Sequence, residues 1–450
     1  MNLYKNTIVL LSIILFYSNC SATINTPYAD PRPDQAVRIE VKNVDELHAL
    51  NPNPGDTIYL VDSLWENSQI TLKGIGTADK PIVFRVADPQ KTSFSKNSNL
   101  TIDGEWIIAD GFVFKDGFST GKDVIIFSKK SSHCTLKNTA ILDYNPDNKE
   151  VDYKWVSLYG THNAVVNCEF TGKTHSGTTL VVWLDENPNH HIITRNYFGH
   201  RPELGTNGGE TIRIGTSHWS MHSSNTLVIN NIFDNCDGEI EIISVKSCHN
   251  TIEDNLFYEC SGTLTLRHGN DNIIRNNFFI GNEKANSGGI RVIGERHLVE
   301  GNYLYKLKGK SLRASLSIMN AVENPELNAY FQVQDAQVKN NIVVGCAEGI
   351  IIGAGANTTR TVVPKNLTIQ GNILQNVSTV IKYEAQPIGL SIDNNQTNAS
   401  ISENGFLKLN ELLEANEYGI YTDMPAFWLD KSNKIGPDGT NLDQTKLVGK

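Results

Sequence analysis

The chain has 450 residues, a formal net charge of −10 and a pI near 5.7. This acidic balance argues against nucleic acid as the main partner, because proteins that bind nucleic acid neutralise phosphates with an excess of lysine and arginine. It leaves an anionic substrate open, since a basic groove can lie on an acidic protein. A chain of this length usually forms two or three domains, but elongated repeat folds are an exception.

The N-terminus has the pattern of an export signal. In MNLYKNTIVLLSIILFYSNC, Lys5 precedes the apolar run Thr7–Tyr17, which is too short to span a bilayer. Cys20 resembles the acylated cysteine of a bacterial lipoprotein, and the alternative is an ordinary secretory signal cut a few residues later. We therefore expect a signal at residues 1–20 and a linker at residues 21–37. The protein is expected in the periplasm, on the outer membrane through a lipid anchor, or in the medium.

Six more cysteines follow the signal. Disulfides are permitted in an exported protein, but no spacing among these residues resembles a zinc site. A chain this long does not need crosslinks, so we expect free thiols that pack as small apolar residues. The six are Cys134, Cys168, Cys236, Cys248, Cys260 and Cys346.

Short segments at the two ends are expected to cap the fold. NVDELHAL, Asn43–Leu50, has the pattern of a short amphipathic helix, and PGDTIYL then begins the first strand region. FLKLNELLEANEYG, Phe406–Gly419, is expected to form a helical segment at the other end. Between them we expect one domain over residues 38–440, with a polar tail at residues 441–450.

A short phrase recurs between these ends. Each copy has an apolar or β-branched run, then an asparagine, then two or three apolar or aromatic residues, as in NTLVINNIF, NTIEDNLF and NIIRNNFF. Successive asparagines are 22 to 39 residues apart, a period typical of solenoids, propellers and arrays. The aligned asparagines are Asn138, Asn167, Asn196, Asn231, Asn255, Asn277, Asn302, Asn341 and Asn372.

The spacing favours an all-β parallel β-helix. The phrases alternate with period two, which argues against a helical solenoid. The shortest repeats have too few residues for the four strands of a propeller blade. Three short strands per coil fit, with loops that absorb the differences in length. The repeated asparagine is expected to hydrogen-bond the backbone at an inward turn and to form an internal ladder.

One sheet of the expected solenoid places charged side chains side by side. In TIRI, EIEI, TLTLR and GIRV the aliphatic positions share one parity and are expected in the core. The other parity then faces outward, and neighbouring coils lie about 4.8 Å apart. We expect one outward column of Arg213, Glu241, Thr265 and Arg291, with Ser157 and Tyr159 outward two coils earlier.

Glu239 and Glu241 stand on one face of a strand and need positive charge nearby. A salt-bridged ladder with the arginines of the adjacent coils is one arrangement. A hard cation is another, because calcium binds carboxylate and amide oxygens. The glycine-rich loop TNGGE offers Asn207 as such an amide ligand.

Three motifs resemble those of polysaccharide lyase family 6, which contains alginate lyases and chondroitinase B-like enzymes. They are TNGGETIRIG, EIEIISVKS and LTLRHGN, and the resemblance extends over roughly residues 38–440. It implies a right-handed parallel β-helix with the site on one sheet and Ca²⁺ as cofactor. By this resemblance Asn207, Glu239 and Glu241 are calcium ligands, Lys246 is the catalytic base, Arg267 is the catalytic acid, and Arg213, His268, Arg291, Tyr159 and Tyr330 bind substrate.

The chemistry of uronic acid cleavage suits these residue types. β-Elimination removes the C5 proton beside a carboxylate, and a bound cation would offset the charge that develops there. Lysine is protonated at neutral pH, and neighbouring positive charges favour its free amine, so Lys246 can serve as base. Guanidinium hardly deprotonates, which favours charge stabilisation by Arg267, with the proton relayed from water or tyrosine.

We therefore expect an exported, calcium-dependent lyase acting on alginate. One alternative is the same chemistry on chondroitin or dermatan sulfate. A second is a pectinase-type β-helix glycoside hydrolase, although Glu239 and Glu241 on one strand face leave little room for an acid and a base on opposite sides of a bond. A third is a non-catalytic carbohydrate-binding solenoid, which would need no Lys246. The sequence leaves block preference, endo or exo mode, and a monomer or dimer open.

Overall fold

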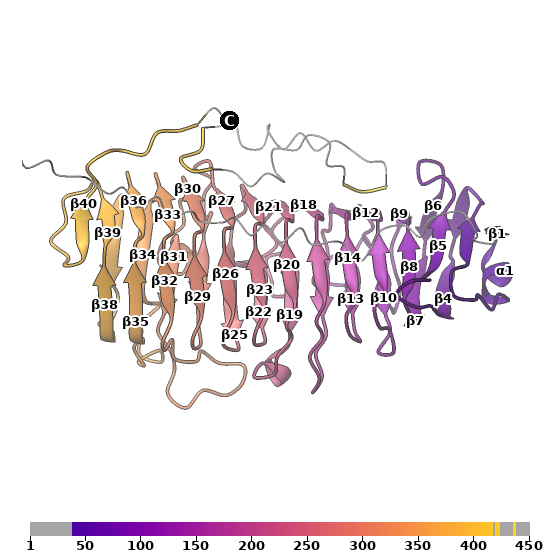
Figure 1. Ribbon diagram of the computed structural model, residues 1–450, viewed down its shortest axis with the longest axis horizontal. Helices are drawn as coiled ribbons and strands as arrows, with labels where there is room; N and C mark the ends of the chain where they lie inside the picture. Colours follow the sequence, from indigo (N-terminus) through magenta and orange to yellow (C-terminus); the bar gives the residue numbers. More distant parts are fainter. Residues whose placement is uncertain (1–37, 417–418, 424–434, 438–450) are drawn as a thin grey trace, which may run out of the picture.

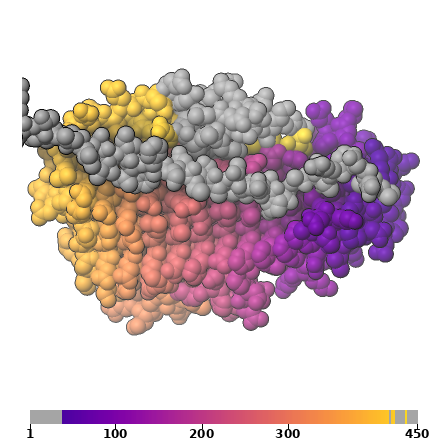
Figure 2. Space-filling model, viewed as in Figure 1, coloured from indigo at the N-terminus to yellow at the C-terminus, as the bar shows by residue number. Residues whose placement is uncertain are grey.

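The computed structural model describes residues 38–416, 419–423 and 435–437. In this part of the chain the strands form three parallel sheets that run the length of the molecule (Figure 1). Each coil adds one strand to each sheet, which makes the fold the parallel β-helix expected from the repeats, with the right-handed coiling that the resemblance implies. In the space-filling view the colours change in chain order along the body, as stacked coils require (Figure 2).

Several expectations fall on residues that the structure does not describe. They are the signal at residues 1–20, the linker at residues 21–37, the lipid anchor at Cys20 and the tail at residues 441–450. Among the residues described, no helix has the length and apolarity needed to cross a bilayer.

Sheet A receives the first strand of each coil. Its strands pair in register and in parallel, for example Thr251 of β23 with Ile273 of β26. The strands are β1 (Arg38–Val41), β2 (Thr57–Leu60), β5 (Ile82–Val86), β8 (Ile107–Asp110), β11 (Thr135–Lys137), β14 (Ala164–Val166), β17 (Ile192–Thr194), β20 (Leu227–Ile229), β23 (Thr251–Glu253), β26 (Ile273–Arg275), β29 (Leu298–Glu300), β32 (Gln337–Lys339), β35 (Lys365–Gln370) and β38 (Ile388–Asp393).

Sheet B follows after a sharp turn. The strands are β3 (Leu64–Glu66), β6 (Ser93–Lys96), β9 (Val113–Gly117), β12 (Ala140–Leu142), β15 (Glu169–Thr171), β18 (Tyr197–Arg201), β21 (Ile232–Cys236), β24 (Leu256–Tyr258), β27 (Phe278–Ile280), β30 (Tyr303–Tyr305), β33 (Ile342–Val344), β36 (Ile373–Gln375), β39 (Asn395–Thr397) and β40 (Phe406–Lys408).

Sheet C carries the motif residues singled out in the sequence. The strands are β4 (Gln69–Ile75), β7 (Asn99–Glu105), β10 (Ile125–Phe127), β13 (Val156–Leu158), β16 (Leu180–Val182), β19 (Ile212–Gly215), β22 (Glu241–Lys246), β25 (Thr263–His268), β28 (Ile290–Val292), β31 (Leu316–Met319), β34 (Glu348–Ala354) and β37 (Thr379–Tyr383). Loops after these strands protrude at the lower edge of Figure 1 and include the short helical turn η2 (Ser217–Trp219). A second such turn, η3 (Ser311–Arg313), precedes β31.

The N-terminal cap is the helix expected from the sequence. Helix α1 (Val44–His48) begins after Asn43, whose side chain accepts the Glu46 N–H at 2.9 Å. The Glu46 carboxylate in turn accepts the Lys42 N–H at 2.8 Å, so two free donors at the helix start are satisfied. Leu47 is buried against the first coils and closes this end of the core.

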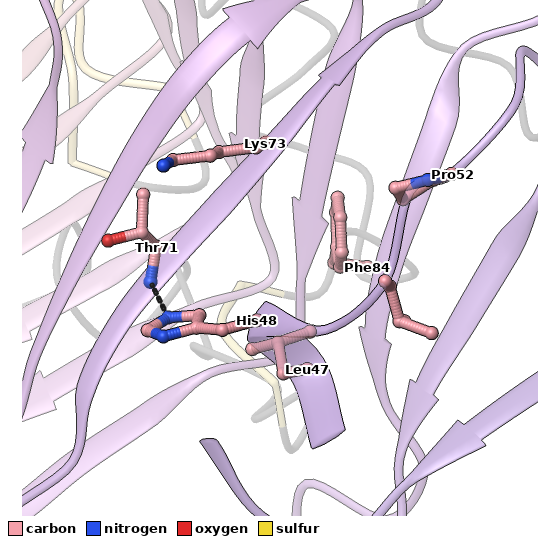
Figure 3. A pocket seen from close by; sticks show the side chains of 7 residues that line it. Leu47, His48, Pro52, Thr71, Lys73 and Phe84 are labelled. Atoms are coloured by element: carbon pink, nitrogen blue, oxygen red, sulfur yellow. Dashed lines mark hydrogen bonds between the residues drawn. The ribbon is translucent and has the colours of Figure 1, made fainter. Parts of the chain in front are cut away.

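A small pocket lies between this cap and the first coils (Figure 3). The N–H of Thr71 on β4 donates to Nε2 of His48 at 3.0 Å and ties α1 to sheet C. Leu47, His48 and Phe84 line the pocket, which has a volume of about 150 Å³. Its lining comes from the cap and the first coils, so the pocket is separate from the charged motifs of the central coils.

The expected C-terminal helix is wrong in the described residues. Phe406–Lys408 forms strand β40, which pairs with β39, and residues 409–416 are not helical. The free edge of β39 offers unpaired backbone groups, and pairing with Phe406–Lys408 satisfies them. Tertiary pairing therefore overrides the helical pattern of this segment.

Buried asparagines form the expected internal ladder. Each backbone N–H and side-chain amide donates to the amide oxygen of the next coil, as Asn277 does to Asn302 at 3.0 and 2.9 Å. The ladder bonds satisfy polar groups that the turn would otherwise leave buried and unpaired. The members are Asn196, Asn231, Asn255, Asn277, Asn302, Asn341, Asn372 and Asn395.

The sequence alignment misplaced the first two asparagines by one residue. Asn138 and Asn167 have φ of 47° and 57° and occupy the left-handed position that precedes the ladder. Cys168 takes the ladder position and donates its N–H to Asn196 at 2.9 Å. The sequence assigned both the turn and the ladder to one asparagine. In the structure Asn167 takes the left-handed turn and Cys168 takes the ladder position, because the left-handed residue cannot also point its side chain inward.

The apolar core runs continuously beside the ladder. Five phenylalanines stack along sheet B, with ring centroids 4.5 to 5.3 Å apart, close to the spacing of the coils. All six cysteines in the described residues are free and buried, as expected. Burial raises the pKa of the Cys168 thiol to about 12, so this group packs as a neutral apolar residue.

We expect Asn277→Ala to lower the melting temperature strongly. The variant removes ladder bonds to Asn255 and Asn302 and leaves buried donors without partners, at a cost of about 1–3 kcal/mol each. Thermal unfolding followed by circular dichroism measures the change. Asn187→Ala, at an exposed loop position, is the control and should unfold like the wild type. Equal melting temperatures for the two variants would contradict a structural role for the ladder.

Candidate active site

Sheet C brings the two expected arginines to the same outward column but not the expected glutamate. Arg213 pairs with Ser244, Ser244 with Thr265, and Thr265 with Arg291. Glu241 instead pairs with Thr263, at the start of β22. The predicted column is therefore correct at three positions, and Ser244 stands where Glu241 was expected.

A register shift between β22 and β25 accompanies this difference and changes which residues of β22 face outward. The shift lies between Glu241 and Ile243, so Ile242 and Ile243 are both buried in the core although they are consecutive. Strict alternation would have put Ile240 in the core, but Ile240 precedes the strand and is only half-buried. The irregularity displaces Glu241 toward the strand's beginning and the loop that precedes it.

Glu241 is buried and already compensated by positive charge. It accepts hydrogen bonds from the Arg291 guanidinium and from the Ser244 hydroxyl, the latter at 2.5 Å. Nε of Arg267 lies 3.7 Å from its Oε1. The salt-bridged ladder considered for the sequence is therefore present for this glutamate.

Glu239 is held by backbone groups instead. Its Oε2 accepts the N–H groups of Gly208 and Gly209 at 3.0 and 3.2 Å. Asn207, the residue before these glycines, is exposed at the start of the same loop. Burial raises the pKa of Glu239 to about 7, and the charges of Glu210 and Glu241 raise it further in the same direction.

Glu210 is a third carboxylate that the sequence reasoning missed. It is 2% exposed, its Oε1 lies 3.8 Å from Nζ of Lys246, and its Oε2 has no hydrogen-bond partner. Glu210 stands two residues before Ile212, so strict alternation would place both side chains in the core. It precedes β19, however, and strand alternation does not apply there. Its position in the TNGGE loop beside Asn207 was the available signal.

Lys246 lies at the end of β22, opposite His268 of β25. Its amine faces Glu210 as described, a carboxylate that the sequence did not mark as part of the site. His268 is buried, and burial followed by the charges of Arg267 and Lys246 lowers its pKa to about 3. At neutral pH this imidazole is therefore uncharged, and it lies 3.2 Å from the hydroxyl of Ser217.

Arg267 is fixed by the long loop between β31 and β32. Its guanidinium donates to the carbonyl oxygens of Asn328 and Ala329 at 3.0 and 3.2 Å. It also lies 4.4 Å from the centre of the Tyr330 ring. The loop thus brings Tyr330, far away in sequence, to the group that includes Glu241.

An aromatic pair supports Arg213 on the other side. Its guanidinium lies 5.2 Å from the Trp183 ring, and this ring stacks on Tyr159 at 5.6 Å. The indole N–H of Trp183 donates to the Ser157 hydroxyl at 3.0 Å. The sequence analysis missed Trp183. Val181 pairs with Ser157, which was expected to face outward, and Trp183 follows Val181 by two residues, so alternation predicts that Trp183 also faces outward.

The donor set suits a hard cation, although the described residues show no ready-made group of three His, Cys, Asp or Glu ligands. Glu241 is turned toward Arg291, so its oxygens are engaged. Two observations nevertheless indicate uncompensated negative charge: the raised pKa of Glu239 and the orphaned Oε2 of Glu210. Carboxylate and amide oxygens are the ligands that calcium prefers. Glu239, Glu241, Glu210 and Asn207 therefore fit Ca²⁺ by chemistry.

The chain was compared with known proteins. The sequence profile of the chondroitinase B family matches residues 41–423. The structure of the PL6 family alginate lyase AlyGC is similar, with 36% identity and a TM-score of 0.83 over 92% of this chain and 58% of that one. The chain belongs to polysaccharide lyase family 6. A structure of an AlyGC mutant gives 38% identity and a TM-score of 0.82 over 85% and 55%.

A full-length match comes from a second family 6 enzyme. It is a mannuronic acid specific lyase from human gut microbiota, with 29% identity and a TM-score of 0.79 over 91% of this chain and 98% of that one. This chain thus spans just over half of AlyGC but corresponds to nearly the whole of the gut enzyme. No curated protein matches the sequence.

We expect the folded protein in calcium-free buffer with EDTA to lose stability as the pH rises from about 4.5 to about 7. The pKa of Glu239 is raised from 4.5 to about 7 in the folded state, so the folded protein holds a proton there that the unfolded chain has released. Stability falls with pH wherever the folded state binds more protons. Glu239→Gln cannot ionise and should flatten this slope, as measured by calorimetric melting temperatures across the pH range.

The exposed Glu326 provides the matched control, since Glu326→Gln should keep the wild-type slope. If Glu239→Gln and the wild type show the same pH dependence, the crowding of negative charge at this site is disproved.

Proposed function

We propose that the protein is a calcium-dependent polysaccharide lyase that cleaves alginate by β-elimination and leaves a 4,5-unsaturated uronic acid end. The observation that carries this proposal is the position of the Lys246 amine, 3.8 Å from the buried carboxylate of Glu210, in a site where the charges of Glu210 and Glu241 act on Glu239. Arg267 and Arg291 lie against Glu241, and Arg213 pairs with Ser244 of the same strand, so positive charge is close by for an anionic polymer. The related AlyGC structures, whose names specify alginate, support this choice of substrate.

The proposed reaction breaks the C5–H bond and the C4–O bond of the uronate. The proton passes to the amine of Lys246, the electron pair forms the C4=C5 double bond, and the leaving oxygen takes up a proton. Glu239, Glu241, Glu210 and Asn207 would hold the cation. When bound, calcium would offset the negative charge that develops on the substrate carboxylate.

The proposed base lies against a proposed calcium ligand. Nζ of Lys246 is 3.8 Å from Oε1 of Glu210, and a general base must be within reach of the proton that it abstracts. A cation held by Glu210 would therefore bring the substrate carboxylate next to the Lys246 amine.

Arg267 is suited to stabilising the charge of the leaving oxygen. A guanidinium hardly deprotonates in proteins, and this one is fixed by Asn328, Ala329 and the Tyr330 ring. The proton itself comes from water or a tyrosine hydroxyl in this proposal. His268, uncharged and buried beside Lys246, would orient the sugar by hydrogen bonding rather than by charge.

Arg213 and Arg291 are placed to bind substrate carboxylates in different ways. Arg213 rests on Trp183, and its buried Nε has no hydrogen-bond partner. Arg291 is 2% exposed and contacts Glu241, so it positions this glutamate and retains an unpartnered Nε. We assign Arg213 to recognition of a substrate carboxylate, and Arg291 to substrate contacts beside Glu241.

We expect the purified protein to produce a rising ultraviolet absorbance from unsaturated ends when it is mixed with alginate. EDTA should abolish the activity and added Ca²⁺ should restore it, because the grouped carboxylates need a counter-charge. Dermatan sulfate, tested in parallel, should give no such signal.

Three results would contradict parts of this proposal. Full activity in EDTA would remove the metal role. Cleavage of dermatan sulfate in place of alginate would favour the chondroitinase-type alternative. Saturated products would indicate a hydrolase.

We expect Lys246→Met to reduce kcat by about 10²–10⁴-fold, the range typical of a lost general base, with little change in KM. Methionine keeps the length of the side chain but cannot accept a proton. Initial rates on alginate provide the measurement. Lys339→Met on β32 of sheet A is the control and should keep wild-type kinetics. Normal turnover by Lys246→Met would exclude this residue as the base.

A further inference from the structure

Arg201 is a buried arginine at the end of β18, beneath the loop that holds Glu239. Its guanidinium donates to the carbonyl oxygens of Gly208 and Glu210 at 3.0 and 2.7 Å. It also donates to the carbonyl oxygens of Gly177 and His175 at 2.8 and 3.4 Å and to Oγ1 of Thr179 at 3.0 Å. A single side chain thus joins the loops of two successive coils.

The charge of Arg201 has no direct acidic partner. Within the described residues no carboxylate oxygen lies within 4.0 Å of its guanidinium, and all five acceptors are carbonyl or hydroxyl oxygens. Burial lowers its pKa to about 10, so the group remains charged at neutral pH. Burying an unpaired charge is costly, and dipoles aimed at it must compensate. The backbone around Arg201 is accordingly arranged to face it.

One peptide group links Arg201 directly to Glu239. The carbonyl oxygen of Gly208 accepts from Arg201, and the N–H of Gly209, which belongs to the same peptide group, donates to Glu239 at 3.2 Å. In a planar trans peptide the C=O and N–H point in opposite directions, so fixing one orients the other. Arg201 therefore aims this N–H at the carboxylate from the opposite side.

The loop has few other ways to keep this orientation. Gly208 has a φ of 100°, a conformation that glycine adopts readily, so its own backbone preference does not fix it. Gly209 packs on Gly238, and a Cβ on Gly209 would come within 2.3 Å of the Gly238 oxygen. The contact restricts side chains but supplies no hydrogen bond. Arg201 supplies the directional bond to the Gly208 carbonyl, and at the Glu210 carbonyl it adds to the bond from the Thr179 backbone N–H at 3.2 Å.

We propose that Arg201 is a positioning residue of the active site, which orients the Gly208–Glu210 loop so that Glu239 and Glu210 converge as cation ligands. Arg201 acts through the loop and does not touch substrate. The proposal rests on the proposed function for the role of the carboxylates, but the orientation of the loop can be measured without it.

The test compares Arg201→Lys and Arg201→Met with the wild type in two measurements. Calorimetric titration with Ca²⁺ alone should show affinity about 10–100-fold weaker in both variants, as is typical when a residue that orients metal ligands is lost. Hydrogen exchange without metal should be faster at the Gly208 and Gly209 amides. Lysine keeps the charge but cannot bridge two carbonyls in a fixed fork, so it should restore the affinity only in part.

Asn277→Ala is the control for general destabilisation, because this ladder residue makes no contact with the loop. It should bind Ca²⁺ with wild-type affinity despite a lower melting temperature. If Arg201→Met does not fold, Thr179→Val removes one acceptor of Arg201 with little change in shape and should weaken binding in the same direction.

Two results would overturn the inference. One is unchanged exchange at Gly208 and Gly209 in folded Arg201 variants. The other is an equal loss of calcium affinity in Asn277→Ala. If the wild type itself binds no Ca²⁺, the metal role in the proposed function fails, and the exchange measurement still decides the role of Arg201.

Discussion

The in-register stacking of the coils is the constraint on which the rest of the structure depends. Parallel strands from successive coils lie side by side, so residues 22 to 39 apart in sequence become neighbours at the spacing of a β-sheet. The buried asparagine ladder holds this register, since each amide satisfies the next coil and a shift by one residue would leave all of them unpaired. The charged wall of sheet C exists only because the register holds.

The centre of this wall balances two opposed sets of charges. Glu210, Glu239 and Glu241 are crowded together, and only Glu241 has a close guanidinium partner in Arg291. The remaining negative charge appears as a raised pKa at Glu239 and an unpartnered oxygen at Glu210. Such a cluster is costly for the folded state alone. A cation and an anionic polymer would both relieve it, which connects the electrostatics of the fold to the proposed chemistry.

The cationic groups around the carboxylates are fixed by contacts from other parts of the chain. The Tyr330 ring and two loop carbonyls hold Arg267, and Trp183 holds Arg213. From below, Arg201 orients the peptide that binds Glu239. The site is therefore built from a regular sheet, which sets the spacing, and from irregular loops, which set the direction of each functional group.

The sequence by itself determined the architecture and named a set of candidate site residues. Period-two alternation and the recurring asparagine sufficed for a parallel β-helix, the Asn43 cap sufficed for α1, and the aliphatic parity of the motifs sufficed to place Arg213, Thr265 and Arg291 in one column of sheet C. Only the tertiary structure decided the shift that replaced Glu241 by Ser244 in the column, the inclusion of Glu210, and the loss of the expected helix at Phe406. Alternation is a local property of a strand, whereas bulges, loop contacts and edge pairing depend on what the neighbouring coil presents.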